Sequence, residues 1–288
     1  MAETIGYVSD VEGNRDYWER YVAISEVLGR EEDGSLVLKD GCHFVFGGDA
    51  VDKGPGDMVV VKDLLSLKKR YPERVFLLIG NRDANKLRFS SELDEAFWSK
   101  EQLLEDSGCL CYWVEEAKRV SPKAFLEKDG NSADTRVNRL RWMLKETMGC
   151  DTTFEMRRRE LSAQRSSSVA NTEAVTDEEV LESFLASVRP GDERCFMLKY
   201  LQASQLAAVV GDVLFVHGAV NEKNMGRVPG VASRIEDARE WAEQLNAWCQ
   251  AEVATFASSN GTWSVEPSEG KKGQRAADAL MDYGVPGG

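Results

Sequence analysis

The sequence predicts an α/β fold with a largely parallel sheet, and three observations lead to that class. Short apolar runs alternate along the chain with segments whose apolar residues recur at helical spacing. One run, residues 75–79, is almost entirely apolar, as expected of a strand covered on both faces. Three of the runs end in polar, acid-rich loops. Because ligands bind beyond the carboxyl ends of parallel strands, these loops predict where a site lies.

The first strand is expected over residues 4–9, and the polar segment 10–14 follows it as a loop. A helix is expected next, which makes the first round strand, loop and helix. Its apolar positions, which recur at helical spacing, are Tyr17, Trp18, Tyr21, Val22, Ile24, Val27 and Leu28.

Two further rounds repeat this order. A strand over residues 44–46 leads to Asp49, and the apolar run at 75–79 leads to Asn81. Between them, apolar positions from residue 58 to residue 67 indicate a helix, which a proline closes.

The second half of the chain is mainly helical. Residues 91–206 are expected to form a helical insertion within a single domain that spans residues 1–288. Residues 209–216 then indicate strands joined by a tight Gly-Asp turn, which lead to His217. Residues 235–256 indicate a further helix.

The composition favours some classes of protein over others. With 288 residues, 42% of them hydrophobic, the chain can bury a substantial core. Its net charge of −13 argues against nucleic-acid binding, although bound metals would still allow a phosphorylated substrate. No apolar stretch approaches the roughly 18 residues of a membrane span, and no targeting pattern opens the sequence. We therefore expect a cytoplasmic protein without membrane contact, whose six scattered cysteines are reduced and mostly buried.

Four loops collect residues that bind metals and phosphates. The first loop holds both Asp10 and Glu12, and the other three hold Asp49, Asn81 and His217. Each loop lies at the end of a predicted strand. Carboxylate oxygens suit Mg²⁺ and Mn²⁺, whereas imidazole suits Mn, Fe and Zn. Two such ions can clamp a phosphate and activate water, with a shared carboxylate between them. Asp49 is the candidate for that bridge.

Each residue alone also has a structural interpretation. Asp10 can end a strand or cap a helix, and Asn81 can be a turn residue. His217 can be a core histidine with its hydrogen bonds satisfied, which is the interpretation we favour for His43. The metal-site interpretation depends on the four loops occurring together, in one order, at four strand ends.

The four motifs together resemble a known family. They read Asp10-Val-Glu12, Gly48-Asp49-Ala-Val-Asp52-Lys53-Gly54, Gly80-Asn81-Arg82-Asp83 and His217-Gly218. They look like the calcineurin-like metallophosphoesterases, especially the branch of serine/threonine phosphatases and diadenosine tetraphosphatases. The resemblance covers about residues 4–90 and 206–220.

This resemblance implies a four-layer α/β sandwich of two sheets flanked by helices. It also implies a centre of two divalent ions, Mn, Fe, Zn or Mg, that hydrolyses phosphate esters or nucleoside polyphosphates. The substrate would be a phosphorylated small molecule, a nucleotide or a phosphoprotein. Carried over by motif, Asp10 and Glu12 would bind the first ion, Asp49 would bridge, and Asn81 and His217 would bind the second.

The resemblance also suggests catalytic and phosphate-binding residues. We place Lys53, Arg82 and Asp83 in the catalytic set, with Lys53 and Arg82 contacting substrate phosphate. Lys86 and Arg88 would extend that phosphate-facing patch, although solvated helix positions explain them as well.

Three departures from the family pattern stand out. Glu12 replaces the usual histidine and remains an oxygen ligand. Arg82 replaces a histidine often assigned as the acid; arginine cannot donate a proton near neutral pH, so we expect electrostatic stabilisation, or else an ion pair with Asp83 or Glu92. The late Gly-His-x-His motif is missing, because no histidine follows His217. Either the C-terminal part is incomplete relative to the family, or other groups and waters complete the metal coordination, or the site binds metal poorly.

Three functions remain open from the sequence. The first is a metal-dependent phosphoesterase, and the second is a degenerate member that binds metal, phosphate or a protein partner without turnover. In the third, exposed tryptophans in and beyond the helical region anchor a partner, against which core packing is the preferred explanation. The tryptophans concerned are Trp98, Trp113, Trp142, Trp241, Trp248 and Trp263.

Overall fold

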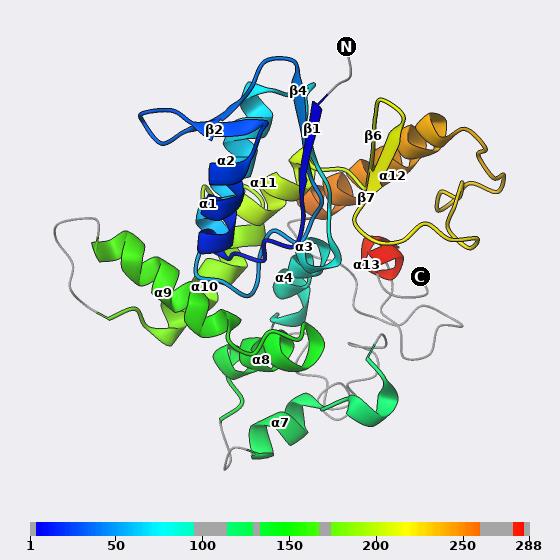
Figure 1. Cartoon of the computed structure of the whole chain (residues 1–288). Coiled ribbons are helices and arrows are strands. Elements are labelled where there is room, and N and C mark those ends of the chain that lie inside the picture. Colours follow the sequence, from blue (N-terminus) through cyan, green and yellow to red (C-terminus); the bar gives the residue numbers. More distant parts are fainter. Residues whose placement is uncertain (1–3, 95–113, 129–132, 167–173, 260–278, 285–288) are drawn as a thin grey trace. The chain divides into compact units, whose positions relative to one another are not determined.

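The computed structural model of the chain (Figure 1) describes residues 4–94, 114–128, 133–166, 174–259 and 279–284. The structure is mixed α/β and divides into two compact units. The sheet unit comprises Met1–Ala84 with Phe196–Thr255, and the helical unit comprises Asn85–Cys195 with Phe256–Gly288.

The sheet unit is built on three parallel strands, as the alternating pattern predicts. The strands are β1 (Thr4–Val8), β4 (Cys42–Phe46) and β5 (Val75–Leu77), and β4 lies in the middle. Val8 pairs with Phe46 and Phe46 pairs with Leu77, so the carboxyl ends of all three strands meet at one edge.

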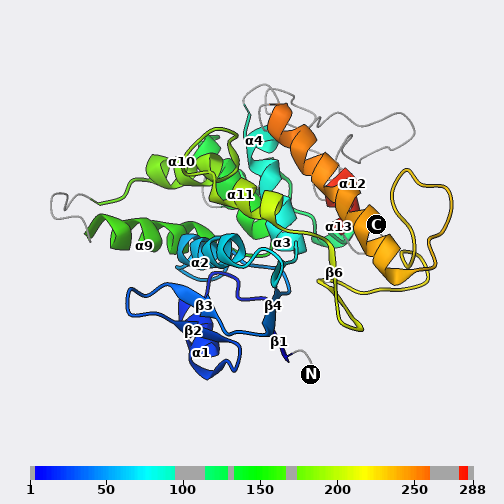
Figure 2. The ribbon, with the colours of Figure 1, turned by 90° about the horizontal axis from the view of Figure 1, so that it is seen from above.

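One face of this sheet packs against helices. Phe44 and Phe46 of β4 contact the fully buried Trp18 of α1 (Arg15–Ile24), with ring centroids 6.3 Å apart in both pairs. Helix α2 (Asp57–Arg70) lies beside α1, and α11 (Phe196–Ala203) contacts α2. Figure 2 shows α1 and α2 on one side of strands β1 and β4. Strand β6 lies on the other side of the same two strands.

The opposite face packs against the hairpin of β6 (Ala207–Val210) and β7 (Val213–Val216). Val45 and Leu78 form a buried cluster there with Ala208 and Val210 of β6. The hairpin turns at Gly211-Asp212, which confirms that prediction, and β7 leads directly to the loop of His217.

Helix α12 (Ala238–Ser258) fixes the outer edge of β6. Asn246 of α12 accepts hydrogen bonds from the backbone amides of Leu206 and Ala207 and donates to the Ala207 carbonyl. This helix confirms the one expected at residues 235–256 to within a few residues at each end.

The first predicted helix is too long. It ends at Ile24, and the hydroxyl oxygen of Ser25 accepts hydrogen bonds from the amides of Val27 and Leu28, which therefore leave the helix. The chain then forms an antiparallel hairpin of β2 (Leu28–Arg30) and β3 (Leu36–Leu38). An Asp-Gly turn follows β2 in the sequence and was the available signal.

The helical unit contains the elements expected of an insertion, although α11, inside the predicted range 91–206, belongs to the sheet unit. Its longest described helices are α9 (Thr153–Ser166) and α10 (Asp177–Val188), and α10 begins with a capping box at Thr176. The other described helices are η1 (Asn85–Leu87), α4 (Arg88–Glu92), η3 (Glu116–Lys118), α7 (Pro122–Lys128), α8 (Arg136–Trp142), η4 (Met143–Thr147) and α13 (Ala279–Gly284).

Several side chains with two sequence interpretations are placed by the structure. Trp142 and Trp241 are buried, which confirms core packing for these two. His43 stacks on Phe76, but its Nδ1 atom is buried without a hydrogen-bond partner among the described residues, so the expectation of a satisfied histidine was wrong. Trp98, Trp113, Trp263, Cys109 and Cys111 lie outside the described residues.

None of the helices that the structure describes has both the length and the apolar character needed to span a membrane. Of the described cysteines, Cys150, Cys195 and Cys249 are buried free thiols and Cys42 is partly exposed, in agreement with the expected reduced state.

A glycine substitution tests the packing of α1 and its following loop on the sheet. A Cβ atom at Gly6 would overlap Cγ2 of Val27, so we expect Gly6→Ala to lower the free energy of unfolding by about 1–3 kcal/mol. Urea denaturation measures this. Gly29→Ala is the matched control, because its Cβ atom would meet only an ordinary contact. Val27→Ala should relieve the overlap in the double mutant; independent, additive effects would contradict the packing described.

Cysteine labelling tests burial in α12. Burial raises the pKa of Cys249 to about 12, so its thiolate is scarce at pH 8 and its sulfur is covered. Iodoacetamide at pH 8, followed by peptide mass mapping, should modify Cys42 well before Cys249. Cys249 should react only after unfolding in urea; modification of both at equal rates in folded protein would contradict this.

Candidate metal centre

The loops that follow β1 and β4 are joined by backbone hydrogen bonds. The amide of Asp10 donates to the carbonyl of Gly48 at 3.0 Å. The amide of Glu12 donates to the carbonyl of Asp49 at 2.9 Å. These bonds continue the parallel ladder past the strand ends. The two acidic loops are therefore held at a fixed distance from each other, and their carboxylates are brought to the same edge of the sheet.

The backbone of these loops is strained at the acidic residues. Asp10, Glu12, Asp49 and Asp52 have φ values of 54°, 50°, 55° and 126°. Within the described part of the chain these are all the non-glycine residues with positive φ. Each such residue costs about 1 kcal/mol or more, and such residues cluster at functional sites. The hydrogen bonds between the loops offset that cost.

The carboxylate of Asp83 joins the loops that follow β4 and β5 by accepting hydrogen bonds from their backbone amides. One oxygen accepts hydrogen bonds from the amides of Asp49 and Gly80, both at 2.9 Å, and the other accepts from the amide of Ala50 at 2.9 Å. Asp83 is fully buried, and this burial, together with the charge of Asp49, raises its pKa to about 7. Asp83 therefore positions the two loops, and its place in the catalytic set stays a prediction.

Gly80 is needed where the third loop meets the second. A Cβ atom at this position would overlap the side chain and the amide of Asp49. The absence of a side chain lets α3 (Asn81–Ala84) begin directly beside Asp49, as expected of glycines that flank a site.

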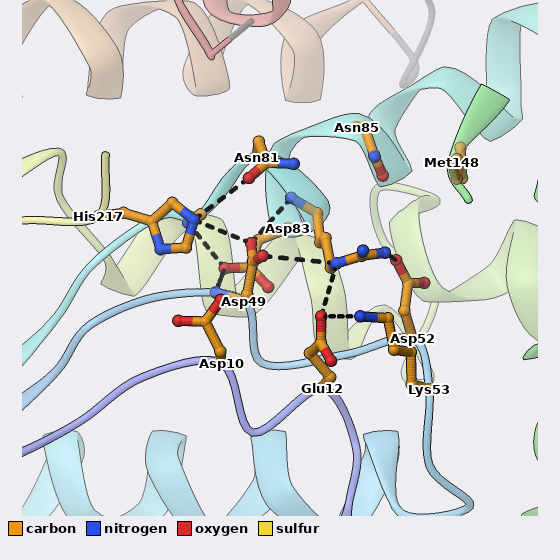
Figure 3. Close-up of polar contacts among 12 residues, drawn as sticks. Asp10, Glu12, Asp49, Asp52, Lys53, Asn81, Asp83, Asn85, Met148 and His217 are labelled. Carbon is orange, nitrogen blue, oxygen red and sulfur yellow. Dashed lines mark hydrogen bonds and ion pairs between the residues drawn. The ribbon is translucent and has the colours of Figure 1, made fainter. Parts of the chain in front are cut away.

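Three groups form a candidate metal-binding set. One carboxylate oxygen each of Asp10 and Asp49 and one ring nitrogen of His217 all lie within 4.8 Å of one another. Figure 3 shows these side chains converging, with Asn81 beside them. The Nε2 atom of His217 lies 3.2 Å from the amide oxygen of Asn81 and 3.4 Å from Oδ1 of Asp49. Two carboxylates and an imidazole fit a divalent transition metal.

The second nitrogen of His217 orients the ring. Nδ1 lies 2.8 Å from the carbonyl oxygen of Gly47, which can only accept, so Nδ1 carries the proton in this arrangement. The lone pair of Nε2 then faces oxygen atoms of Asn81 and Asp49, which also accept only, so a cation would be needed to satisfy all three atoms. Metal-binding histidines use the same arrangement, in which a backbone carbonyl fixes the tautomer.

Burial raises the pKa of Asp49, while a hydrogen bond from the backbone amide of Arg82 and the charge of the Arg82 guanidinium oppose that rise. The cause is the cost of holding a carboxylate away from water. A cation bound beside Asp49 would remove this cost.

Glu12 and Arg82 lie on the other side of Asp49. Oε1 of Glu12 is 2.8 Å from Nε of Arg82 and 2.7 Å from Nζ of Lys53. Arg82 also approaches Oδ2 of Asp49 at 3.5 Å and Oδ2 of Asp52 at 3.3 Å. These printed contacts of Arg82 are with Glu12, Asp49 and Asp52, and the ion pair with Asp83 or Glu92 stays one of two predicted alternatives.

The structure thus brings together Asp10, Asp49, Asn81 and His217, and it surrounds Glu12 with cations. Lys86 and Arg88 belong to the helical unit. Both are buried, so their interpretation as solvated helix positions was wrong, and Arg88 pairs with Glu92 through two hydrogen bonds. Their predicted contact with phosphate stays a prediction.

Two buried carboxylates beside the centre had no assigned role in the sequence prediction. Asp52 is buried and pairs with Arg82, and Asp57 accepts a hydrogen bond from the amide of Asp52 at 3.0 Å. Asp52 could have been predicted to lie near the centre, because it belongs to the same Gly-Asp motif as Asp49. Asp57 could not, because a single acidic residue in the first turn of a helix is commonplace.

Comparisons with known proteins add little. No protein-family model and no curated protein matches the chain. Among solved structures, the chain is similar to a protein serine/threonine phosphatase from Saccharomyces cerevisiae with similarity to human phosphatase PP5, at 22% identity and a TM-score of 0.24. The similar region covers 30% of this chain and 24% of that one, so the chain spans about a quarter of its length.

Replacing Asp83 tests its positioning role. In Asp83→Asn, the side-chain NH2 group would replace an oxygen that now accepts from a backbone N–H, so two donors would face each other. We therefore expect the free energy of unfolding to fall by about 2 kcal/mol or more. Asp212→Asn at the exposed hairpin turn is the control and should change it by less than about 0.5 kcal/mol. Urea denaturation measures both, and equal effects would contradict the role of Asp83.

Proposed function

We propose that this chain is a metal-dependent phosphoesterase. The observation that carries the proposal is the convergence of Asp10, Asp49 and His217 within 4.8 Å, where loops extend from the carboxyl ends of parallel strands. Ligands bind at that edge of parallel sheets. The oriented Nε2 of His217 supports it, because an imidazole fixed in this way is prepared for a metal.

A divalent ion held by these three residues would lower the pKa of a bound water and offset the charge of a phosphate group. Asn81 adds an amide oxygen beside the same position. Lys53 has a side chain 47% exposed and can exchange Glu12 for a phosphate oxygen of the substrate. Arg82 would add a fixed positive charge, since a guanidinium does not lose its proton.

The finer parts of the proposal follow from the motifs. We propose a calcineurin-like chain in which helices, the parallel sheet, the β6–β7 hairpin and α12 belong to a four-layer sandwich. Its substrate would be a phosphorylated small molecule, a nucleotide or a phosphoprotein, hydrolysed in the cytoplasm. Manganese, iron, zinc and magnesium all remain candidates for the ion.

A second candidate function is binding without turnover. Arg82 and Lys53 pair with Glu12, a residue that the motif assigns to a metal ion. A centre altered in this way can bind metal and phosphate while failing to activate water. Thermal stabilisation by metal with phosphate, without product formation from any phosphate ester tested, would favour this candidate.

The test of the first candidate is hydrolysis of p-nitrophenyl phosphate by the whole chain, titrated with Mn²⁺, Mg²⁺ or Zn²⁺. We expect turnover that EDTA abolishes and that added metal restores. Asp49→Asn should weaken metal binding by more than about 10-fold, because loss of even a residue behind the ligands costs 10–100-fold in other proteins. Asp212→Asn is the matched control for a lost carboxylate.

Circular dichroism establishes that each variant is folded before it is assayed. A folded, metal-loaded chain without hydrolysis would contradict the phosphoesterase and leave the second candidate. Metal affinity unchanged by Asp49→Asn would contradict the site itself.

A further inference from the structure

The side chain of Glu12 lies in a different environment from Asp10 and His217. Its Oε1 atom accepts from both Arg82 and Lys53 at distances of 2.8 and 2.7 Å. The motif resemblance would make Glu12 a ligand of one of two metal ions. In the structure, this oxygen is already bound to the cations of Arg82 and Lys53, and Figure 3 shows its contact with Lys53.

The guanidinium of Arg82 is surrounded by carboxylates. It approaches Glu12, Asp49 and Asp52 at 2.8, 3.5 and 3.3 Å, from three separate positions along two loops. Its side chain is 17% exposed, and those of Asp49 and Asp52 are 5% and 0% exposed. Because these charges are largely removed from water, they depend on one another more than a surface pair would.

Asp49 divides the centre into two halves. Its Oδ1 atom lies 3.4 Å from Nε2 of His217, and its Oδ2 atom lies 3.5 Å from Nε of Arg82. One oxygen thus belongs to the candidate metal set, and the other belongs to the group around the guanidinium. A carboxylate that bridges two metal ions also divides its two oxygens in this way.

We infer that the centre binds one metal ion and that Arg82 takes the place of a second. The metal ion is held by Asp10, Asp49 and His217, and the guanidinium neutralises Glu12 and Asp52. A second divalent ion beside Glu12 would meet the positive charges of Arg82 and Lys53. This inference rests on the proposed metal site and deepens it, because it states how many ions the site holds.

Arginine suits this role for chemical reasons. Its guanidinium keeps its charge at every pH at which the protein is folded, and its planar array of donors binds several carboxylates at once. A guanidinium also contributes no lone pair to a metal ion. A fixed cation is therefore built into the chain in place of one that must be bound from solution.

The test is the number of Mn²⁺ ions bound per chain, measured by calorimetric titration and by metal analysis after desalting. The wild-type chain should bind one ion. Arg82→Ala should bind two, because the guanidinium that lies among Glu12, Asp49 and Asp52 would no longer occupy the place of a second cation. Arg82→Lys, the matched control that keeps the charge, should bind one. The electron paramagnetic resonance spectrum should be that of an isolated Mn²⁺ ion in wild type and should show coupling between ions in Arg82→Ala.

Glu12→Gln provides a second decision that does not depend on the folding of Arg82→Ala. It should leave one bound ion with affinity changed less than about 3-fold, since Glu12 is not a ligand here, whereas a Glu12 ligand would lose about 10-fold or more. Two ions in the wild-type chain, or one ion in folded Arg82→Ala, would overturn the inference while leaving the metal site. No bound ion in the wild-type chain would overturn the proposed function as well.

Discussion

The geometry of the centre depends on the carboxylate of Asp83. Its two oxygens bind three backbone amides from two loops, and this fixes where Asp49 and the start of α3 lie. Without that contact the chain would have three buried amides without this acceptor, and fewer hydrogen bonds would offset the strain of the left-handed Asp49. The parallel sheet brings the loops to one edge, and Asp83 sets them at the separation that chemistry requires.

Charge compensation is the second constraint. Asp10, Glu12, Asp49 and Asp52 gather four carboxylates at one sheet edge, in a chain whose net charge is −13. Such a gathering is unstable unless cations enter it. The protein supplies Arg82 and Lys53 on one side of Asp49. On the other side, the carboxylate and imidazole groups of the candidate metal set could be neutralised by a cation from solution.

Much of the sheet unit follows from local sequence patterns. Apolar runs at residues 75–79 and 209–216 predicted β5 and the β6–β7 hairpin, because strands leave a short and distinctive signal. The helix of residues 15–24 was overextended because Val27 and Leu28 keep helical spacing by chance. The interaction that ends it, between the Ser25 hydroxyl and two amides, leaves no mark on an apolar pattern.

The sequence predicted which side chains would lie together, but not how their charges would pair. Motifs identified Asp10, Asp49, Asn81 and His217, since each is a ligand type at a strand end. The partners of Arg82 could not be predicted, because its nearest acidic neighbour in the sequence, Asp83, turns inward toward backbone amides. Long side chains choose among several acids by geometry in space, and spacing along the chain carries no information on that choice.

The most direct measurement is anomalous diffraction at the manganese absorption edge from crystals of the whole chain grown with Mn²⁺. We expect one anomalous peak within about 2.0–2.3 Å of ligand atoms of Asp10, Asp49 and His217, with Arg82 still paired to Glu12. A peak between Glu12 and Asp49, with Arg82 displaced, would contradict the assignment of charges. No peak at this edge of the sheet would contradict the metal centre.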